Sequence, residues 1–420
     1  MIQVEKFVPG GFALGTLADL SSPENGKKVF LLNALPGELV EDFEITKRKS
    51  SYLEAIATKI KSPSPNRIPP KDSCFLSTSP WQILDFSSEL KEKRALVEES
   101  LKEMKIPLDN LEITPVATDG KDFFYRNKME YSLYWNNETE KIYLSFHARG
   151  SHRKVPLYLK NPNFALNPLE SPLSPFSPET AGSSLERPEI AEKALKIVEE
   201  LNNAHASARD YQSLLLRTNQ KGIVSGGLFE KNRPHPIFEN LTDKILGHEY
   251  SYSPNGFFQI NLPVYELALK EIKQEIDASS CKNVLDLYSG VGTIGLSVAP
   301  DRNLTLVEVD KNAYKELVNN CQNSAARPIL SKSEDALNFI EPNQIVILDP
   351  PRAGCDKKLL DRLLEVLPEK IIYLSCNPST QARDVAALLL KGNYKTSSIK
   401  PFNFFPRTPH IENLIVLNRI

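Results

Sequence analysis

The chain has 420 residues, of which 41% are hydrophobic and 25% are charged, and its formal net charge is −2. This composition is typical of a globular protein with two or three domains, and any surface that binds nucleic acid has to be a local basic patch. No apolar run reaches the ~18 residues of a membrane span and no signal peptide is recognisable, so we expect a monomeric cytoplasmic protein without membrane contacts.

The cysteines are scattered along the chain, and no Cys-x-x-Cys pair suggests a zinc or redox site. We therefore expect reduced thiols and no metal. The five cysteines are Cys74, Cys281, Cys321, Cys355 and Cys376.

Residues 1–62 alternate β-rich runs with glycine turns, which predicts a small five-stranded barrel. The expected strands are Ile2–Val8, Phe12–Leu17, Lys28–Leu32, Leu39–Thr46 and Tyr52–Ile60. The sequence of residues 10–15 and 33–38 resembles the TRAM domain, an OB-like RNA-binding module. The basic run Lys47–Lys49 suits phosphate contacts, and a solvated loop fits it equally well.

Residues 63–245 predict an α+β middle domain after a proline-containing linker. A helix is expected at Leu84–Lys105, with mixed charge on its outer faces, and another around Ile190–Leu201. Strands are expected at Lys141–Phe146, Tyr211–Arg217 and Gly222–Phe229. The proline-rich stretch 167–188 predicts a long surface excursion, and the basic cluster Arg149, His152, Arg153 and Lys154 is either a phosphate-binding patch or a solvated loop.

Residues 246–420 repeat a rhythm of apolar strand and helix, which predicts a doubly wound parallel sheet. The expected strands are Val284–Tyr288, Leu304–Asp310, Gln344–Leu348 and Lys370–Leu374.

A glycine-rich turn follows the first of these strands, in the sequence Asp286-Leu-Tyr-Ser-Gly-Val-Gly-Thr-Ile-Gly295. By itself such a turn is as well explained by tight packing as by a ligand. Glu308, which closes the next strand, strengthens the second interpretation because a carboxylate there can bond both hydroxyls of a ribose. The turn lacks the Gly-Lys-Ser/Thr ending of a phosphate loop, so a nucleoside without polyphosphate fits better.

Three further segments carry polar groups at strand ends. Asp349-Pro-Pro-Arg-Ala-Gly354 is a rigid extended loop that holds a carboxylate, either at a ligand or as a plain surface turn. Ser375-Cys-Asn-Pro378 places a thiol at a strand end, and Phe405–Asn413 contains Glu412. A thiol and a carboxylate on one rim are what methylation of a pyrimidine carbon requires, although a lone cysteine usually packs and a lone glutamate is usually solvated.

Six segments in this order resemble the RNA uracil-5-methyltransferase family over nearly the whole chain. They are Arg126–Ser132, Ser253–Asn261, Asp286–Gly290, Asp349–Gly354, Ser375–Pro378 and Phe405–Glu412. The resemblance implies an α/β class I methyltransferase domain with a Rossmann-like doubly wound sheet, preceded by the OB-like barrel and the α+β domain. It also implies S-adenosylmethionine as cofactor and RNA as partner, with 23S ribosomal RNA favoured over the tRNA T-loop.

The resemblance also assigns roles to residues. Cys376 is expected to be the nucleophile that adds to carbon 6 of uracil, and Glu412 the base that removes the carbon-5 proton. The cofactor contacts are expected to be Gln259, Tyr288, Gly290, Thr293, Glu308 and Asp349. The RNA contacts are expected to be Asn127, Lys128 and Met129, with Asp349 also near the target base.

The sequence departs from the family at its cysteines. Many relatives with a TRAM domain hold an iron–sulfur cluster on four cysteines, but only Cys74 remains here, so we expect no cluster. Cys355 follows the Asp-Pro-Pro loop, but it does not stand in the Pro-Cys pair used by cytosine-modifying enzymes.

Two other functions are possible alternatives. An enzyme that methylates an exocyclic amine would need Asp349 but not Cys376, and a non-catalytic RNA-binding protein would need neither.

Overall fold

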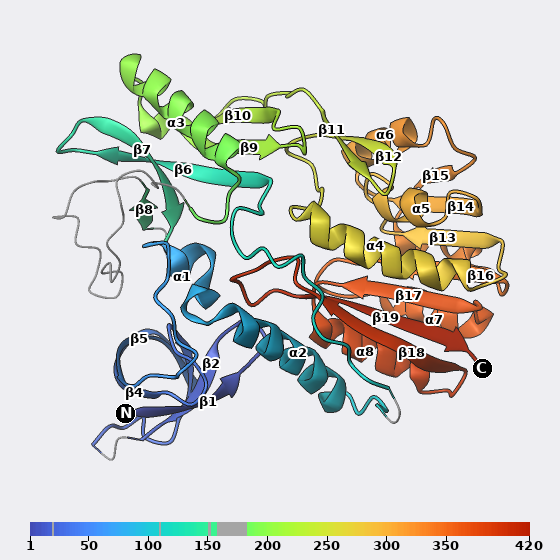
Figure 1. Cartoon of the computed structure of the whole chain (residues 1–420), viewed down its shortest axis with the longest axis horizontal. Coiled ribbons are helices and arrows are strands. Elements are labelled where there is room, and N and C mark those ends of the chain that lie inside the picture. Colours follow the sequence, from blue (N-terminus) through green and yellow to red (C-terminus); the bar gives the residue numbers. More distant parts are fainter. Residues whose placement is uncertain (19–20, 109–110, 150–152, 158–182) are drawn as a thin grey trace.

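The structure, a computed structural model, describes residues 1–18, 21–108, 111–149, 153–157 and 183–420. It contains a barrel, a middle sheet covered by a helix, and a larger C-terminal sheet with helices on both faces (Figure 1). Most of the proline-rich stretch 167–188 and His152 lie outside the described residues. Within the described ranges, no helix is long and apolar enough to cross a membrane.

The N-terminal strands form a closed barrel in the order β1-β2-β3-β5-β4, which confirms the predicted barrel. They are β1 (Ile2–Phe7), β2 (Ala13–Leu17), β3 (Lys28–Leu32), β4 (Leu39–Arg48) and β5 (Tyr52–Ser62). Val29, Leu31 and Leu53 are fully buried inside. Because successive side chains on a strand point to opposite faces, the residues between them face outward.

The middle sheet is antiparallel, with the strand order β10-β9-β6-β7-β8. Its strands are β6 (Lys128–Asn136), β7 (Lys141–His147), β8 (Lys154–Pro156), β9 (Tyr211–Thr218) and β10 (Val224–Glu230). Helix α3 (Pro188–Asn203) buries Ile190 and Ala194 against Tyr131 and Leu214 of the sheet. A separate hairpin, β11 (Leu241–Ile245) and β12 (His248–Tyr252), leads into the C-terminal sheet.

The C-terminal sheet has seven strands in the order β15-β14-β13-β16-β17-β19-β18. The first five are parallel, and β19 runs antiparallel between β17 and β18. The strands are β13 (Asn283–Leu287), β14 (Asn303–Glu308), β15 (Arg327–Leu330), β16 (Gln344–Leu348), β17 (Lys370–Ser375), β18 (Tyr394–Phe402) and β19 (Glu412–Arg419). This architecture confirms the predicted doubly wound domain and adds three strands that the sequence did not predict.

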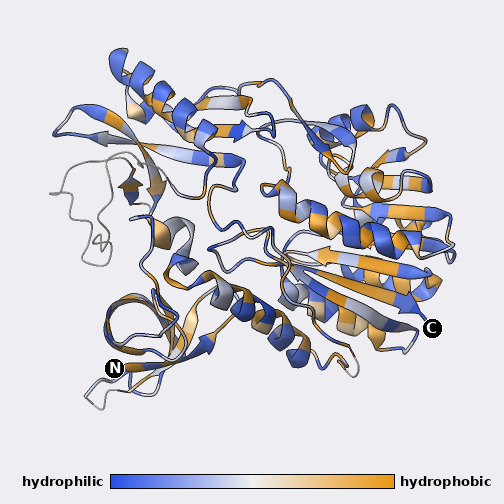
Figure 2. Ribbon diagram, in the orientation of Figure 1, coloured by the Kyte–Doolittle hydropathy of each residue, from blue (hydrophilic) through white to orange (hydrophobic). Residues whose placement is uncertain are grey.

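Both faces of this sheet are covered by helices, so the sheet lies between two hydrophobic cores. One face is covered by α4 (Leu262–Asp277), α5 (Thr293–Val298) and α6 (Lys311–Asn320), and the other by α2 (Phe86–Glu103), α7 (Lys357–Val366) and α8 (Pro378–Leu389). Figure 2 shows the corresponding pattern, with largely hydrophobic strands and hydrophilic faces on α2 and α4. The short helices are α1 (Phe75–Thr78), η1 (Pro80–Ile83), η3 (Ala208–Asp210), η4 (Ser333–Asp335) and η5 (Leu337–Phe339).

Helix α2 joins the barrel to the C-terminal sheet. Its Leu96 packs in the barrel core, whereas Val97 and Leu101 pack in the core beneath β17. The segment after the helix then runs beside the edge strand β18, where Ala117 donates to Pro401 and accepts from Asn403, both at 2.8 Å. The predicted boundaries, 1–62, 63–245 and 246–420, place this connection in the middle domain, whereas its packing ties it to the C-terminal sheet.

Candidate active site

The loop 288–292 leaves β13 at the carboxyl end of the sheet and enters α5. Tyr288, Gly290 and Gly292 have φ values of 64°, 57° and 90°, so the chain turns sharply. Behind the turn, the Gly295 N–H donates to Asp286 Oδ2 at 2.9 Å. A Cβ on Gly295 would lie 2.8 Å from that oxygen, so only glycine fits at this close approach.

The carboxylate of Glu308, at the end of β14, lies beside this loop. Its Oε2 accepts from the Gly290 N–H at 2.8 Å, and its Oε1 accepts from the N–H groups of Val309 and Asp310 at 2.8 and 2.6 Å. The neighbouring Val309 side chain is 55% exposed. A carboxylate beside an exposed apolar side chain suits a ribose and its attached base. Val309 was not identified from the sequence, although its place directly after the acidic strand end was an available signal.

Two other predicted cofactor residues, Thr293 and Gln259, are fixed by hydrogen bonds to neighbouring elements. Thr293 is buried, and its hydroxyl lies 2.8 Å from the hydroxyl of Tyr265 on α4. The backbone carbonyl of Gln259 accepts from Asn127 Nδ2 at 3.0 Å, which ties the middle sheet to the start of the catalytic domain. Their proposed contacts with the cofactor remain predictions.

Tyr288 is half-buried and borders a separate cavity of about 550 Å³. The cavity is lined by Pro351 and Cys355 from the loop after β16, and by residues of α7 and α8. Tyr288 therefore stands between the glycine turn and the Asp-Pro-Pro loop.

Cys376 and Glu412 meet at the carboxyl end of β17. Strands β17 and β19 are antiparallel, and their last pair at this end is Ser375 with Asn413, so Cys376 and Glu412 directly follow and precede the two paired residues. The charge of Glu412 acts on the Cys376 thiol and raises its pKa, which also places the two side chains close together. Cys376 is partly exposed, whereas Glu412 is only 4% exposed. The two residues predicted to be catalytic are therefore adjacent.

Asp349 adds a second carboxyl group to this rim. Strand β16 pairs with β17 in parallel, with Leu348 opposite Tyr373, which places Asp349 on the strand next to Cys376. Burial raises the pKa of Asp349 to about 7. Burial, together with the charge of Asp349, raises the pKa of Glu412 well above its usual range. Two carboxyl groups this close resist simultaneous ionisation, so the pair binds a proton tightly.

The environment of Cys376 disfavours its thiolate in the free protein. Burial and then the charges of Glu412 and Asp349 raise its pKa to about 11, while Arg352 lowers it through its charge and a hydrogen bond. Arg352 Nη2 also lies 3.4 Å from His410 Nδ1. Burial, followed by the charge of Arg352, lowers the pKa of His410 to about 4, so this imidazole is neutral at physiological pH. No role for Arg352 was predicted from the sequence.

We expect the Cys376 thiol to react slowly with iodoacetamide at neutral pH and faster at every step towards pH 10. The thiolate is the reactive form, and with a pKa of about 11 its fraction rises about tenfold per pH unit. The other four cysteines are buried, so mass spectrometry should find the first modification on Cys376. A rate that levels off below pH 9 would contradict the raised pKa.

The residues predicted to face RNA differ in their surroundings. Lys128 Nζ donates to the carbonyl groups of residues 255 and 256 at 3.2 and 3.3 Å, and burial lowers its pKa to about 8. Asn127 is buried beside the same segment, and Met129 packs in the core under α3. Asn127 and Lys128 thus hold the segment that leads to Gln259, and contact of all three residues with RNA remains a prediction.

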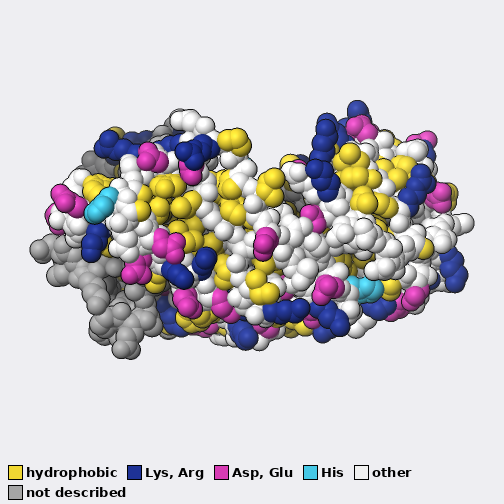
Figure 3. All heavy atoms as spheres, turned by 90° about the horizontal axis from the view of Figure 1, so that it is seen from above, with side chains coloured by type: hydrophobic (Ala, Val, Ile, Leu, Met, Phe, Trp, Pro, Cys, Tyr) yellow, Lys and Arg dark blue, Asp and Glu magenta, His cyan; other side chains and the backbone are white. Residues whose placement is uncertain are grey.

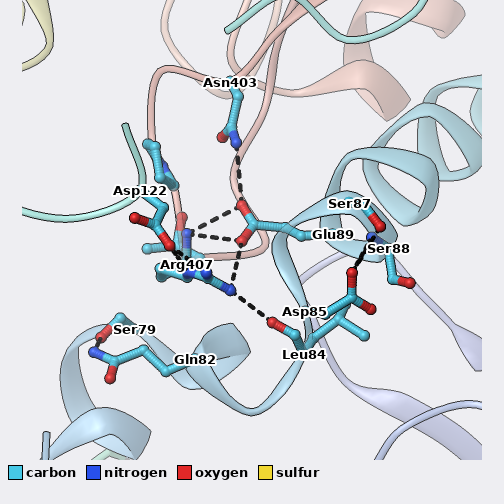
Figure 4. A network of polar contacts seen from close by, with 12 residues as sticks. Ser79, Gln82, Leu84, Asp85, Ser87, Ser88, Glu89, Asp122, Asn403 and Arg407 are labelled. Carbon is cyan, nitrogen blue, oxygen red and sulfur yellow. Dashed lines mark hydrogen bonds and ion pairs between the residues drawn. The ribbon is translucent and has the colours of Figure 1, made fainter. Parts of the chain in front are cut away.

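The loop 403–411 between β18 and β19 is held by a buried ionic network (Figure 4). Glu89 and Lys93 of α2 have no exposed surface and form an ion pair at 2.9 Å. Glu89 accepts from the backbone N–H of Arg407 at 3.0 and 3.1 Å, and Lys93 donates to Asn403 Oδ1 at 2.5 Å. Buried charges are costly unless paired in this way, so α2 fixes the loop that precedes Glu412.

Two further parts of the chain meet this loop. The Arg407 guanidinium pairs with Asp122 and donates to the Leu84 carbonyl at 2.6 Å. The barrel reaches the loop through Gly11, where a Cβ would lie 2.3 Å from the Cβ of Pro409. The barrel turn and the catalytic loop are therefore in direct contact.

Comparison with known proteins points to one family. Residues 334–420 match the family model described as tRNA (Uracil-5-)-methyltransferase. Proteins of Enterococcus faecalis and Synechocystis, both described as uncharacterized RNA methyltransferases, are 27% identical over 93% and 94% of this chain and 92% of their own. The C-terminal fifth of the chain is therefore similar to the uracil-5-methyltransferase family, and nearly the whole chain is similar to curated RNA methyltransferases.

A solved structure has the same fold. Pyrococcus abyssi tRNA (uracil-54, C5)-methyltransferase in complex with S-adenosyl-L-homocysteine matches 99% of this chain and 100% of its own, with a TM-score of 0.71 and 21% identity. The match to this family model and the similarity to RNA methyltransferases confirm the predicted enzyme class and S-adenosylmethionine as cofactor. The residues fit this nucleoside, since Glu308 can bind its ribose and Val309 its base.

The predicted lack of an iron–sulfur cluster remains a prediction. In the part of the chain that the structure describes, no three His, Cys, Asp or Glu side chains are grouped to hold a metal ion. Cys74, the one cysteine that lies ahead of the C-terminal domain, is packed in the hydrophobic core of the middle sheet.

Glu308→Gln should weaken binding of S-adenosylhomocysteine about tenfold to a hundredfold. The amide has no charge for the ribose hydroxyls, and charge-assisted hydrogen bonds contribute about 1.5–3 kcal/mol each. Isothermal titration calorimetry would measure the loss. Glu316→Gln on α6 is a matched control, because Glu316 contacts Asn240 and Ser251 instead of the glycine turn and should not alter the affinity.

Proposed function

We propose that this enzyme methylates carbon 5 of a uridine in RNA through a covalent adduct, with Cys376 as nucleophile and Glu412 as base. Carbon 5 of uracil is too weak a nucleophile to take a methyl group unaided, so it has to be activated by addition at carbon 6. The observation that carries the proposal is that Cys376 and Glu412 lie next to the last paired residues of β17 and β19, on the same sheet edge as Glu308.

In the proposed reaction, the Cys376 thiolate bonds to carbon 6 of the uracil and leaves an enolate. S-adenosylmethionine supplies an electrophilic methyl group on a positively charged sulfur. After carbon 5 has gained the methyl group, Glu412 removes the carbon-5 proton. The electron pair of that bond restores the ring double bond and expels the thiolate of Cys376. Glu412 has to be ionised at this step, and its raised pKa then makes it a stronger proton acceptor than an exposed carboxylate.

Two charged neighbours have supporting roles in this proposal. Arg352 favours the thiolate of Cys376, since its positive charge lowers the thiol pKa. Asp349 contacts the cofactor and the target base from the adjacent strand. The remaining cofactor contacts are Gln259, Tyr288, Gly290 and Thr293, as the family resemblance implies.

We propose that the barrel and the middle domain hold the RNA while residues 246–420 perform the chemistry. The target uridine has to leave its stack to reach Cys376. Lys128 belongs to the surface that receives the flanking nucleotides, and the buried residues Asn127 and Met129 support that surface from behind. On the face of the molecule seen in Figure 3, Lys and Arg side chains are interspersed with Asp and Glu around hydrophobic patches. RNA binding therefore relies on local contacts, as the net charge of −2 also indicates.

The proposed substrate is 23S ribosomal RNA, because of the barrel at the N-terminal side. The tRNA T-loop is the second candidate, favoured by the shared fold of the Pyrococcus abyssi tRNA (uracil-54, C5)-methyltransferase. We also propose that the enzyme is a monomer that acts in the cytoplasm, where the free thiol of Cys376 stays reduced.

Mapping of 5-methyluridine in RNA from a strain that lacks this protein tests the proposal. We expect one or more 5-methyluridines to disappear from 23S ribosomal RNA and to return when the wild-type gene is supplied, but not when the Cys376→Ala gene is supplied. Loss confined to the tRNA T-loop would support the second candidate. An unchanged 5-methyluridine content in both RNAs would refute the proposed reaction.

A further inference from the structure

The outside of the barrel carries a continuous row of aromatic rings. The ring centroids of Phe12 and Phe30 lie 6.2 Å apart, and those of Phe30 and Tyr52 lie 5.2 Å apart, both edge to face. The Arg149 guanidinium, from the end of the middle hairpin, lies over the Phe12 ring at 5.4 Å and donates to the Gly10 carbonyl at 3.3 Å. We call the three rings of Phe12, Phe30 and Tyr52 the aromatic row.

The strand register places Phe30 and Tyr52 on the outer face of the barrel. Phe30 stands between the buried residues Val29 and Leu31, and Tyr52 precedes the buried Leu53, so alternation turns both rings outward. Both rings remain partly exposed. The barrel interior is filled by the alternate residues, so packing of this core does not require aromatic rings at these outer positions.

The row begins beside the catalytic loop. Phe12 follows Gly11, and Gly11 approaches Pro409 so closely that no side chain fits between them. Pro409 lies three residues before Glu412. A strand of RNA with its target uridine at Cys376 would therefore meet Phe12 first and Tyr52 last as it leaves the site.

The charges around the row complement RNA. Its flank carries more cations than carboxylates, and the pairs that they form, such as Lys28 with Glu5 and Lys47 with Glu54 at 2.8 Å, are exposed. Exposed pairs are weak, so phosphate can compete for these lysines. The cations are Lys27, Lys28, Lys47, Arg48, Lys49 and Arg149, and the carboxylates are Glu5, Glu24 and Glu54.

We propose that the aromatic row binds the single-stranded RNA that flanks the target uridine, with bases stacked on Phe12, Phe30 and Tyr52. Stacking on aromatic rings next to a basic groove is how single strands are held without strong sequence preference, whereas bases in a duplex keep their faces covered. This inference rests on the proposed function, because the path of the RNA along the row is drawn from a target uridine bound at Cys376.

The test compares RNA binding by variants of the complete protein. Fluorescence anisotropy with a labelled oligouridylate of about 12 nucleotides should show binding weakened about tenfold or more in the Phe30→Ala/Tyr52→Ala double variant. Tyr52→Phe keeps the ring and should retain the affinity. Leu390→Ala removes an 86% exposed apolar side chain at the end of α8 and should also retain it. Unchanged affinity in a double variant that melts like wild type would overturn the proposal, as would equal loss with a fully paired duplex.

A kinetic measurement separates this inference from the proposed function. With methylation substrate RNA, the double variant should raise KM while kcat stays unchanged. Gly11→Ala, which forces the barrel away from Pro409, should lower kcat; Gly26→Ala is its control, because Gly26 also has a positive φ but nothing within 4 Å. If the wild type methylates no uridine and the double variant still loses RNA affinity, the proposed function is wrong, whereas RNA binding by the aromatic row is supported. A lower kcat at unchanged KM in the double variant would refute the proposal that the aromatic row binds the flanking RNA.

Discussion

Replacing Cys376 with alanine is expected to abolish both methylation and the covalent complex with RNA that contains 5-fluorouridine. In the wild type, fluorine at carbon 5 cannot leave as a proton does, so the reaction stops at the methylated adduct on Cys376. Alanine cannot add to carbon 6, and turnover should fall by at least about 10³-fold. The adduct is detected as a band of reduced mobility in a denaturing gel, and methylation by transfer of a labelled methyl group.

Cys355→Ala is the matched control for this experiment. Cys355 also lies near the Asp-Pro-Pro loop, but it is buried, and burial followed by the charge of Asp384 raises its pKa to about 12. This variant should form the adduct and turn over as the wild type does. Methylation retained by Cys376→Ala would instead support an enzyme that acts on an exocyclic amine, which has no use for the thiol.

Glu412→Gln is expected to leave addition and methyl transfer intact but to block release of the product. Glutamine has nearly the same shape and preserves the backbone pairing of β19 with β18, whereas its amide cannot accept the carbon-5 proton. With ordinary uridine RNA, the methylated adduct should accumulate, and steady-state turnover should fall about 10²- to 10⁴-fold. Rapid-quench sampling on denaturing gels would follow the adduct over time.

Glu365→Gln is the matched control for the Glu412→Gln variant. Glu365→Gln changes a carboxylate that is exposed on α7, where it pairs with Arg362, and should leave turnover unaltered. Normal turnover in Glu412→Gln would refute its role as base. Loss of adduct formation in Glu412→Gln would instead mean that this carboxyl group acts before the methyl transfer.

Local patterns in the sequence predicted much of the fold. The barrel strands were predicted to within two residues because glycine turns separate alternating runs. The parallel strands β13, β14, β16 and β17 were predicted because strands buried on both faces read as continuous apolar runs. Strand β6 was missed, although Met129, Tyr131 and Leu133 alternate with polar residues in the way a half-buried strand requires.

The site depended on contacts that local patterns do not contain. Glu412 reaches Cys376 because β19 inserts between β17 and β18, and sequence spacing alone does not reveal this strand order. Only the family resemblance connected the two residues. Glu89 and Lys93 look like an exposed pair on a helix of mixed charge, yet both are fully buried, because the loop around Arg407 and η1 close over that face of α2.

The same buried network constrains how this protein can be recombined with its relatives. Helix α2 supplies Glu89 and Lys93, whereas their partners Asn403 and Arg407 come from the far end of the chain. A chimera that exchanged residues 1–110 with those of a relative at 27% identity would leave the buried Arg407 and Asn403 facing a foreign helix. Functional hybrids should therefore exchange α2 and the loop 403–411 together, because the two segments depend on each other although they lie about 300 residues apart in the sequence.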